Sequence, residues 1–305
     1  MGAVRADVGE RVVTTSTVLA PLVHPGPVAD HRLESVSSAV LVKRASLPPG
    51  SRLVDAIDGE LAELGVDSAQ VEILGGPLAR VSYCVPALCT DGSRAAWYSD
   101  TIEATAPATI VAGSATVGRR EGERFMHCHA AWYDAHGSLR GGHLWPDTVV
   151  GATSVEVVIR GFASCELRSK QDDETLMPVF TPSAGDGSST GSARAVMTRV
   201  RPGVEIHDAV REVMSRNGFR RASVRGSLGS LVGATLRRDD DIAVAPGPAT
   251  EVTMSGHVVC EGGRLVEVHL PTFVVDRYGK VHMGELVEDG NLVAVTFELL
   301  LEELL

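Results

Sequence analysis

The sequence is short of positive charge. Its 28 lysines and arginines are outnumbered by 39 aspartates and glutamates, so the formal net charge is −11. A protein that binds a polyanion needs a basic face to neutralise phosphates. The composition therefore disfavours nucleic acid as a partner.

Cysteines and long apolar runs are also scarce. None of the five cysteines forms a Cys-x-x-Cys pair, and an odd number fits no closed disulfide framework, so we expect a reducing, cytoplasmic location. The mildly apolar segment 11–23 is interrupted by Thr and Ser and follows Asp7 and Glu10. We expect neither a signal peptide nor a membrane span there.

The chain contains an internal repeat. Residues of the first half recur 153 positions later, as in Pro49-Gly50 with Pro202-Gly203, Asp55 with Asp208, Gly65 with Gly218, and Gly76 with Gly229. A chain of 305 residues is long enough for two domains of about 100–200 residues each. We predict tandem copies at 43–162 and 195–305. Residues 1–42 are then an N-terminal extension, and 163–194 form a linker, because 183–193 are rich in Ser and Gly.

Each copy is predicted to open with a helix. Apolar residues recur at helical spacing over 53–64 and again over 206–214, and Gly65 and Gly218 stand where a helix end favours a left-handed residue. Short runs rich in Val, Ile and Thr follow, bounded by Gly, Pro and Asp. The predicted fold class is α+β, with two tandem domains that each combine a mainly antiparallel sheet with one packed helix.

Three histidines stand at facing positions of a predicted hairpin. His127 and His129 alternate onto one face of a strand, and the turn residues 134–138 centre the hairpin near His136. Reflection through that centre pairs His129 with His143. Cross-strand neighbours have Cβ atoms about 4.5–5.5 Å apart, and the diagonal to His127 is still within reach.

Three converging imidazoles are typical of a divalent metal site. An open fourth position suits zinc best, and iron, nickel or manganese would also fit. The alternative is a hydrogen-bonded core or surface cluster, but packing alone gives no reason for imidazole at all three positions. His136, at the turn, is expected to be solvated.

The second copy repeats the pattern with different residues. A hairpin centre near Arg277 would pair His269 with Glu285 and put Glu267 in the place of His127. Glu267, His269 and Glu285 could hold a second metal, or they could form a structural site in which the carboxylates pair with cations.

Both halves resemble the plant and prokaryote conserved (PCC) domain family. The resemblance rests on the Pro-Gly pair before each predicted helix, on the glycine-rich turns at 75–78 and 226–231, and above all on His127-Cys-His129 followed by Gly141-Gly-His143-Leu144. It implies a compact α/β fold that associates as trimers, and a metal site at the matched histidines. Plant members pair the domain with an AT-hook and bind DNA, but this acidic chain lacks an Arg-Gly-Arg-Pro core.

The leading functional hypothesis is a metal-dependent enzyme, a hydrolase or lyase acting on a small oxygenated metabolite. Candidate acid and base groups are Tyr98, Asp100 and Glu103, which could equally belong to a solvated loop; candidate anion-binding groups are His24, Arg32 and Arg80. A competing hypothesis is a non-catalytic metal- or metabolite-binding regulatory module. DNA binding by family analogy is the third, and the net charge argues against it.

Overall fold

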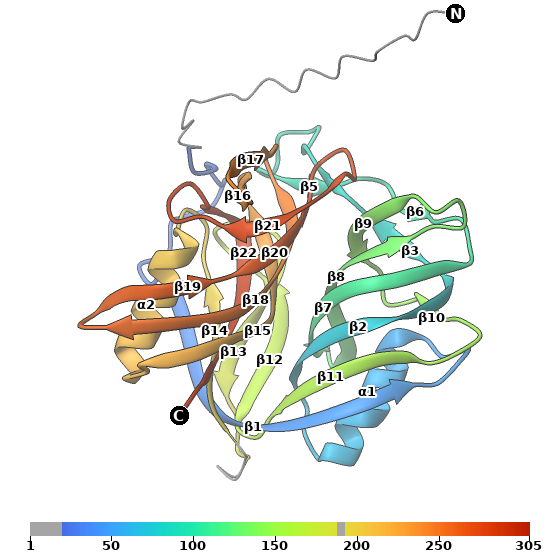
Figure 1. Ribbon diagram of the computed structural model, residues 1–305, viewed down its shortest axis with the longest axis horizontal. Helices are drawn as coiled ribbons and strands as arrows, with labels where there is room; N and C mark the ends of the chain where they lie inside the picture. The colour runs from blue at the N-terminus through green and yellow to red at the C-terminus, as the bar shows by residue number, and fades with distance from the viewer. Residues whose placement is uncertain (1–19, 188–192) are drawn as a thin grey trace, which may run out of the picture.

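The computed structural model describes residues 20–187 and 193–305, and in it the two copies stand side by side (Figure 1). The first copy consists of β1 (Leu33–Leu47), α1 (Leu53–Leu64), β2 (Ala69–Arg80), β3 (Ser82–Cys84), β4 (Pro86–Ala87), β5 (Trp97–Tyr98), β6 (Ile102–Glu103), β7 (Ala108–Arg120), β8 (Glu123–Tyr133), β9 (Leu139–Leu144), β10 (Val149–Val150) and β11 (Val155–Phe162). The second consists of β14 (Ala193–Val200), α2 (Ile206–Asn217), β15 (Arg221–Leu231), β16 (Ala234–Arg238), β17 (Asp241–Ala245), β18 (Thr250–Glu261), β19 (Arg264–His269), β20 (Pro271–Val275), β21 (Val281–Leu286) and β22 (Val293–Glu303).

Both predicted helices are confirmed, and each ends at its predicted glycine. Gly65 and Gly218 both have a φ of 68°, a left-handed conformation that side chains disfavour. The carboxylate of Glu205 caps the start of α2 by accepting hydrogen bonds from the next turn's backbone N–H groups. Neither helix is long and apolar enough to cross a membrane, and the described residues contain no other helix of that kind.

The strands of the two copies follow the same antiparallel order. In the first copy β1, β11, β2, β7, β8 and β9 are successive neighbours, and in the second β14, β22, β15, β18, β20 and β21 are. Each sheet buries one apolar core, the first around Trp132 and the second around Phe297. The predicted α+β class with two tandem units is confirmed.

One strand belongs to both copies. The second half of β1, from Val40 to Leu47, pairs with β11, while its first half, from Leu33 to Val40, pairs with β14 of the second copy. β1 therefore begins ahead of the predicted boundary at residue 43 and joins the two sheets into one. This shared strand fixes how the copies face each other.

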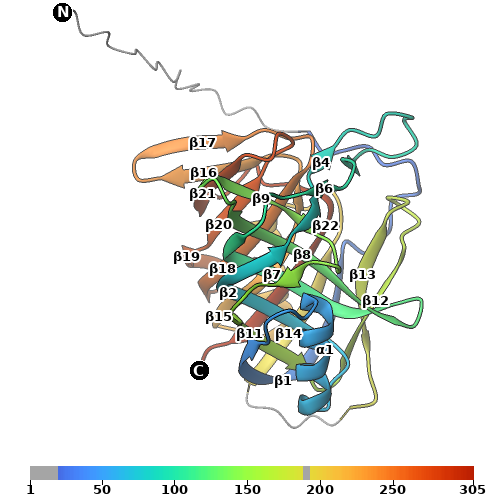
Figure 2. The same cartoon turned by 90° about the vertical axis from the view of Figure 1, so that its right-hand side faces the viewer.

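The segment 163–194 is more than the linker predicted from its composition. It contains a hairpin formed by β12 (Cys165–Gln171) and β13 (Pro178–Ala184), and β12 runs parallel to the end of β7 (Figure 2). Apolar side chains at Leu167 and Phe180 bury the hairpin against both copies. Residues 188–192 of the predicted flexible stretch lie outside the described residues.

The described part of the N-terminal extension packs as an arm over the hairpin and the second copy. His24 donates a hydrogen bond to the carbonyl of Ala294 at 2.7 Å, and the Gly26 N–H donates to the carbonyl of Glu174 at 3.0 Å. Arg32 forms a two-pronged pair with the Glu174 carboxylate. Residues 1–19 lie outside the described residues.

Buried ion pairs join the turn of the β12–β13 hairpin to the second copy. Asp172 lies 2.7 Å from Arg199 and 3.0 Å from Arg201, and its side chain is only 4% exposed. Burial alone would raise the pKa of Asp172, but the hydrogen bond and the charge of Arg199 outweigh burial and lower it from 3.8 to about 2. The carboxylate therefore stabilises the fold above pH 4, and that contribution is lost as the pH falls from 4 towards 2.

We expect Asp172→Asn to lower the free energy of unfolding at pH 7 by about 2–4 kcal/mol, because it removes the buried carboxylate that lies nearest to both guanidinium groups and leaves them the more exposed Glu34. Urea unfolding at pH 7 and pH 3 measures this, and the difference between wild type and variant should shrink at pH 3. The control is Glu63→Gln, at an exposed pair with Lys43, where we expect no measurable change. An equal loss in both variants would contradict the role of the buried pair.

Candidate metal centre

The hairpin of β8 and β9 places the histidines. Backbone pairing sets His129 directly opposite His143, as predicted. The register is fixed by the turn, where the Asp134 carboxylate accepts hydrogen bonds from the N–H groups of His136 and Ser138, and His136 is exposed.

The three imidazoles converge on one point. Their ring centroids are 4.6 Å apart for His127 and His129, 5.1 Å for His127 and His143, and 5.4 Å for His129 and His143. The Nε2 atoms of His127 and His129 are 3.0 Å apart. Both His129 and His143 are buried.

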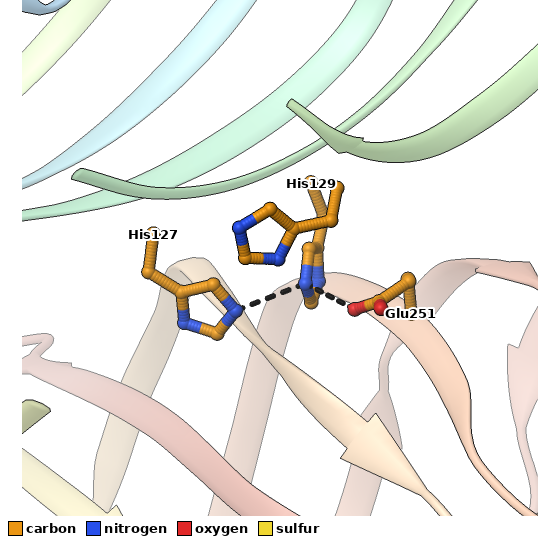
Figure 3. A group of neighbouring side chains, drawn as sticks. His127, His129 and Glu251 are labelled. Carbon is orange, nitrogen blue, oxygen red and sulfur yellow. Dashed lines mark hydrogen bonds and ion pairs between the residues drawn. The ribbon is translucent and has the colours of Figure 1, made fainter. Parts of the chain in front are cut away.

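A carboxylate from the other copy completes the cluster. Glu251, on β18, reaches across and forms an ion pair with His129 through its Oε2 and the imidazole Nε2 (Figure 3). One ligand atom from each of His127, His129, His143 and Glu251 lies within 4.8 Å of the others. Sequence reasoning missed Glu251, and the only signal was a lone carboxylate in an apolar strand.

The Nδ1 atoms of His127 and His129 donate hydrogen bonds to acceptors in the second copy. His129 Nδ1 donates to the carbonyl of Val252 at 3.0 Å, and His127 Nδ1 donates to Glu298 Oε2 at 2.5 Å. The Thr116 hydroxyl donates to the same Glu298 oxygen at 3.1 Å. Such partners fix the tautomer of a ligating histidine, so the two Nε2 lone pairs face the centre of the cluster.

The donor set fits a divalent cation. His143 has both ring nitrogens buried and without a hydrogen-bond partner. The two Nε2 atoms and the Glu251 oxygen lie against one another, but a proton shared among them would not give the His143 nitrogens a partner. A cation at their centre would do so, and three imidazoles with one carboxylate are ligands that zinc accepts.

Charge inside the cluster is controlled by burial and by the second-copy carboxylates. Burial, with the neighbouring His127 and His129, holds the pKa of His143 well below its usual value, so this imidazole is neutral at pH 7. For His127, burial lowers the pKa, but the charge and hydrogen bond of Glu298 outweigh burial and raise it. Neutral imidazole is the form that binds metal, so His143 is ready to do so.

A cavity of about 200 Å³ adjoins the histidines and lies between the copies and the hairpin. Its wall is largely aromatic and apolar, and it includes Trp97, Tyr98, Phe125, Trp145, Met177, Val179, Phe180 and Val295. Small-molecule sites typically combine such walls with a few polar groups. The cluster therefore lies at one side of a space that a ligand can occupy.

Of the predicted acid and base candidates, only Tyr98 lines this cavity. Its ring centroid is 5.2 Å from that of His143. Burial, followed by the charge of Glu251, raises the pKa of Tyr98 well above its ordinary value, so the hydroxyl stays protonated. Asp100 is exposed outside the cavity, and Glu103 is half-exposed and paired with Arg80 at 2.7 Å.

None of the three predicted anion-binding residues lines the cavity. His24 and Arg32 are engaged in fixing the arm, as described above. Arg80 lies 3.0 Å from Asp147 in addition to its pair with Glu103, and it is half-exposed. Residue type alone suggested these positions, and the structure gives their polar groups other partners.

The register predicted for the second copy is wrong. The turn closes between Asp276 and Lys280, so its centre is Tyr278 rather than Arg277, and Pro271 lies opposite Glu285. His269 then matches His127, and Pro271 replaces His129. Proline carries no side-chain donor for a metal, and the chain breaks into β19 and β20 beside it.

The predicted second triad does not converge. His269 and Glu285 still form an ion pair at 2.9 Å, but Glu267 is bound instead by His257 at 3.0 Å, and all but Glu285 are largely exposed. Within residues 20–187 and 193–305, the only convergent group of three or more His, Cys, Asp or Glu is the first-copy histidines with Glu251.

Comparison with solved structures finds proteins that each span about one copy. A plant- and prokaryote-conserved protein of Pyrococcus horikoshii is 19% identical, with a TM-score of 0.37, over 46% of this chain and 93% of its own. A metal-containing protein of Archaeoglobus fulgidus is 20% identical, with a TM-score of 0.40, over 48% and 96%. A protein of Ralstonia eutropha JMP134 provisionally described as DNA-binding is 17% identical, with a TM-score of 0.38, over 45% and 88%.

A search among curated proteins finds no match. The model of the Plants and Prokaryotes Conserved (PCC) domain matches residues 38–163 and again residues 187–305, which together make up most of the chain. The chain therefore belongs to the PCC domain family and carries two tandem copies of that domain.

Proposed function

We propose that this protein is a metal-dependent enzyme, a hydrolase or lyase, that acts on a small oxygenated metabolite. The observation that carries the proposal is the convergence of His127, His129, His143 and Glu251 beside a cavity. Zinc is the proposed metal, because three imidazoles and one carboxylate suit its preferences. A bound zinc ion would polarise a substrate carbonyl and make a hydrolytic water more acidic.

Other residues of the chain orient the histidines and can donate or accept protons. Glu298 orients His127 through Nδ1, and the Val252 carbonyl orients His129 in the same way. Tyr98 keeps its proton at neutral pH and can donate a hydrogen bond to a developing oxyanion in the cavity. Glu251 can accept a proton at a carboxylate oxygen if it does not ligate the metal itself.

The presence of these groups favours the enzyme over a non-catalytic binding module. A module that merely binds a metal would need no acid or base beside it. Here a protonated tyrosine and a carboxylate line one cavity with the histidines.

Metal content tests the first part of the proposal. Untagged protein should carry one zinc ion per chain by inductively coupled plasma mass spectrometry, and His129→Ala should carry none, because it removes one of the three imidazole ligands. His136→Ala, at the exposed hairpin turn, and His269→Ala, at the second-copy position, should keep the full content. Equal content in wild type and His129→Ala would contradict the assignment.

Turnover tests the second part. In a screen of esters, lactones and small acids, we expect the best substrate to lose about 100-fold or more in kcat with Tyr98→Phe, with zinc content unchanged, because the variant removes only a proton donor. Tyr133→Phe is the matched control, because Tyr133 is exposed at the end of β8, on the hairpin that carries the histidines. No turnover of any substrate by zinc-loaded protein would favour the regulatory module instead.

A further inference from the structure

Arg120 lines the edge of the cavity, is only half-buried, and has no carboxylate partner in the described part of the chain. It ends β7 and lies over the ring of Phe125, 5.3 Å from its centroid. The neighbouring Arg119 differs, because it is bound to Asp67 at 2.8 Å and lies outside this cavity. Arg120 is also the only Lys or Arg among the lining residues.

Two hydrogen-bond donors in the wall lack partners, as does one acceptor, Glu298 Oε1. The Thr296 hydroxyl and the Trp145 indole N–H are buried and make no hydrogen bond within the described residues. Both residues line the cavity, and Thr296 is 5% exposed. Buried donors without partners are costly, so their clustering around one space indicates a ligand that brings oxygen atoms to them.

We propose that the substrate is a small monocarboxylate with an apolar or aromatic body, and that Arg120 binds its carboxylate. The inference rests on the proposed function for the reacting end, which faces the histidines. A guanidinium matches one carboxylate through two parallel hydrogen bonds, whereas a phosphate dianion would call for more than one cation. The cavity volume suits roughly ten non-hydrogen atoms, and the aromatic wall suits an apolar body.

The position of Arg120 makes it a specificity-determining residue rather than a catalytic one. It lines the same cavity as the histidines, but it makes no ion pair with Glu251 or Glu298, whose carboxylates are bound by His129 and His127. Its charge nevertheless reaches Tyr98, whose pKa it lowers against the larger effect of burial.

The test is calorimetric titration with phenylacetate, 3-phenylpropionate and hexanoate, each beside its neutral amide, on zinc-analysed wild type, Arg120→Gln and Arg120→Lys. We expect at least one acid to bind wild type in preference to its amide, and Arg120→Gln to weaken that acid about 10- to 100-fold. The amides should not distinguish the proteins. Arg120→Lys should recover part of the affinity, because lysine keeps the positive charge but lacks the two parallel N–H donors of the guanidinium.

Arg119→Gln is the matched control, and it should leave acid binding unchanged. Thermal unfolding of Arg120→Gln should match wild type, because no ion pair is lost. Equal binding of acids and amides by wild type, or equal weakening by both arginine variants, would overturn the inference. Loss of acid binding in His129→Ala but not in Arg120→Gln would also overturn it, because the carboxylate would then bind at the metal. If the protein takes up no zinc but still binds the acid through Arg120, the inference stands and the proposed function is contradicted.

Discussion

Two buried pairs across the boundary between the copies constrain everything else in this protein. His127 is bound by Glu298, and His129 by Glu251, with all four side chains at most 13% exposed. Removing one partner of such a pair leaves an uncompensated buried charge, at a cost of about 3–5 kcal/mol. The copies therefore cannot shift relative to each other without losing these pairs, and the cavity takes its shape from their fixed packing.

The two copies supply different parts of one cluster. The first carries the imidazoles on the β8–β9 hairpin, and the second supplies carboxylates from β18 and β22. At the equivalent hairpin of the second copy, Pro271 takes the position of a ligand. A single chain thus builds one complete site from two copies of a domain.

Local features could be predicted from the sequence, and long-range ones could not. The helix ends followed from Gly65 and Gly218, and the pairing of His129 with His143 followed from a turn whose length sets the register. Glu251 and Glu298 reach the site because the two copies pack against each other, with β1 paired to both β11 and β14, and no local pattern predicts that contact. Their one local signal is a carboxylate among apolar neighbours, as in Phe297-Glu298-Leu299. The predicted register of the second copy was wrong because its turn centre lies one residue further along. Association of chains into trimers stays a prediction.

The central claim is that one metal site is built from both copies of the same chain. Anomalous diffraction at the zinc edge on crystals of the zinc-loaded protein tests it most directly. The account predicts one peak per chain, about 2.0–2.2 Å from a nitrogen of each of His127, His129 and His143, with Glu251 of that chain on the open side. A peak at His269 and Glu285, or a site whose carboxylate comes from a different chain, would contradict it.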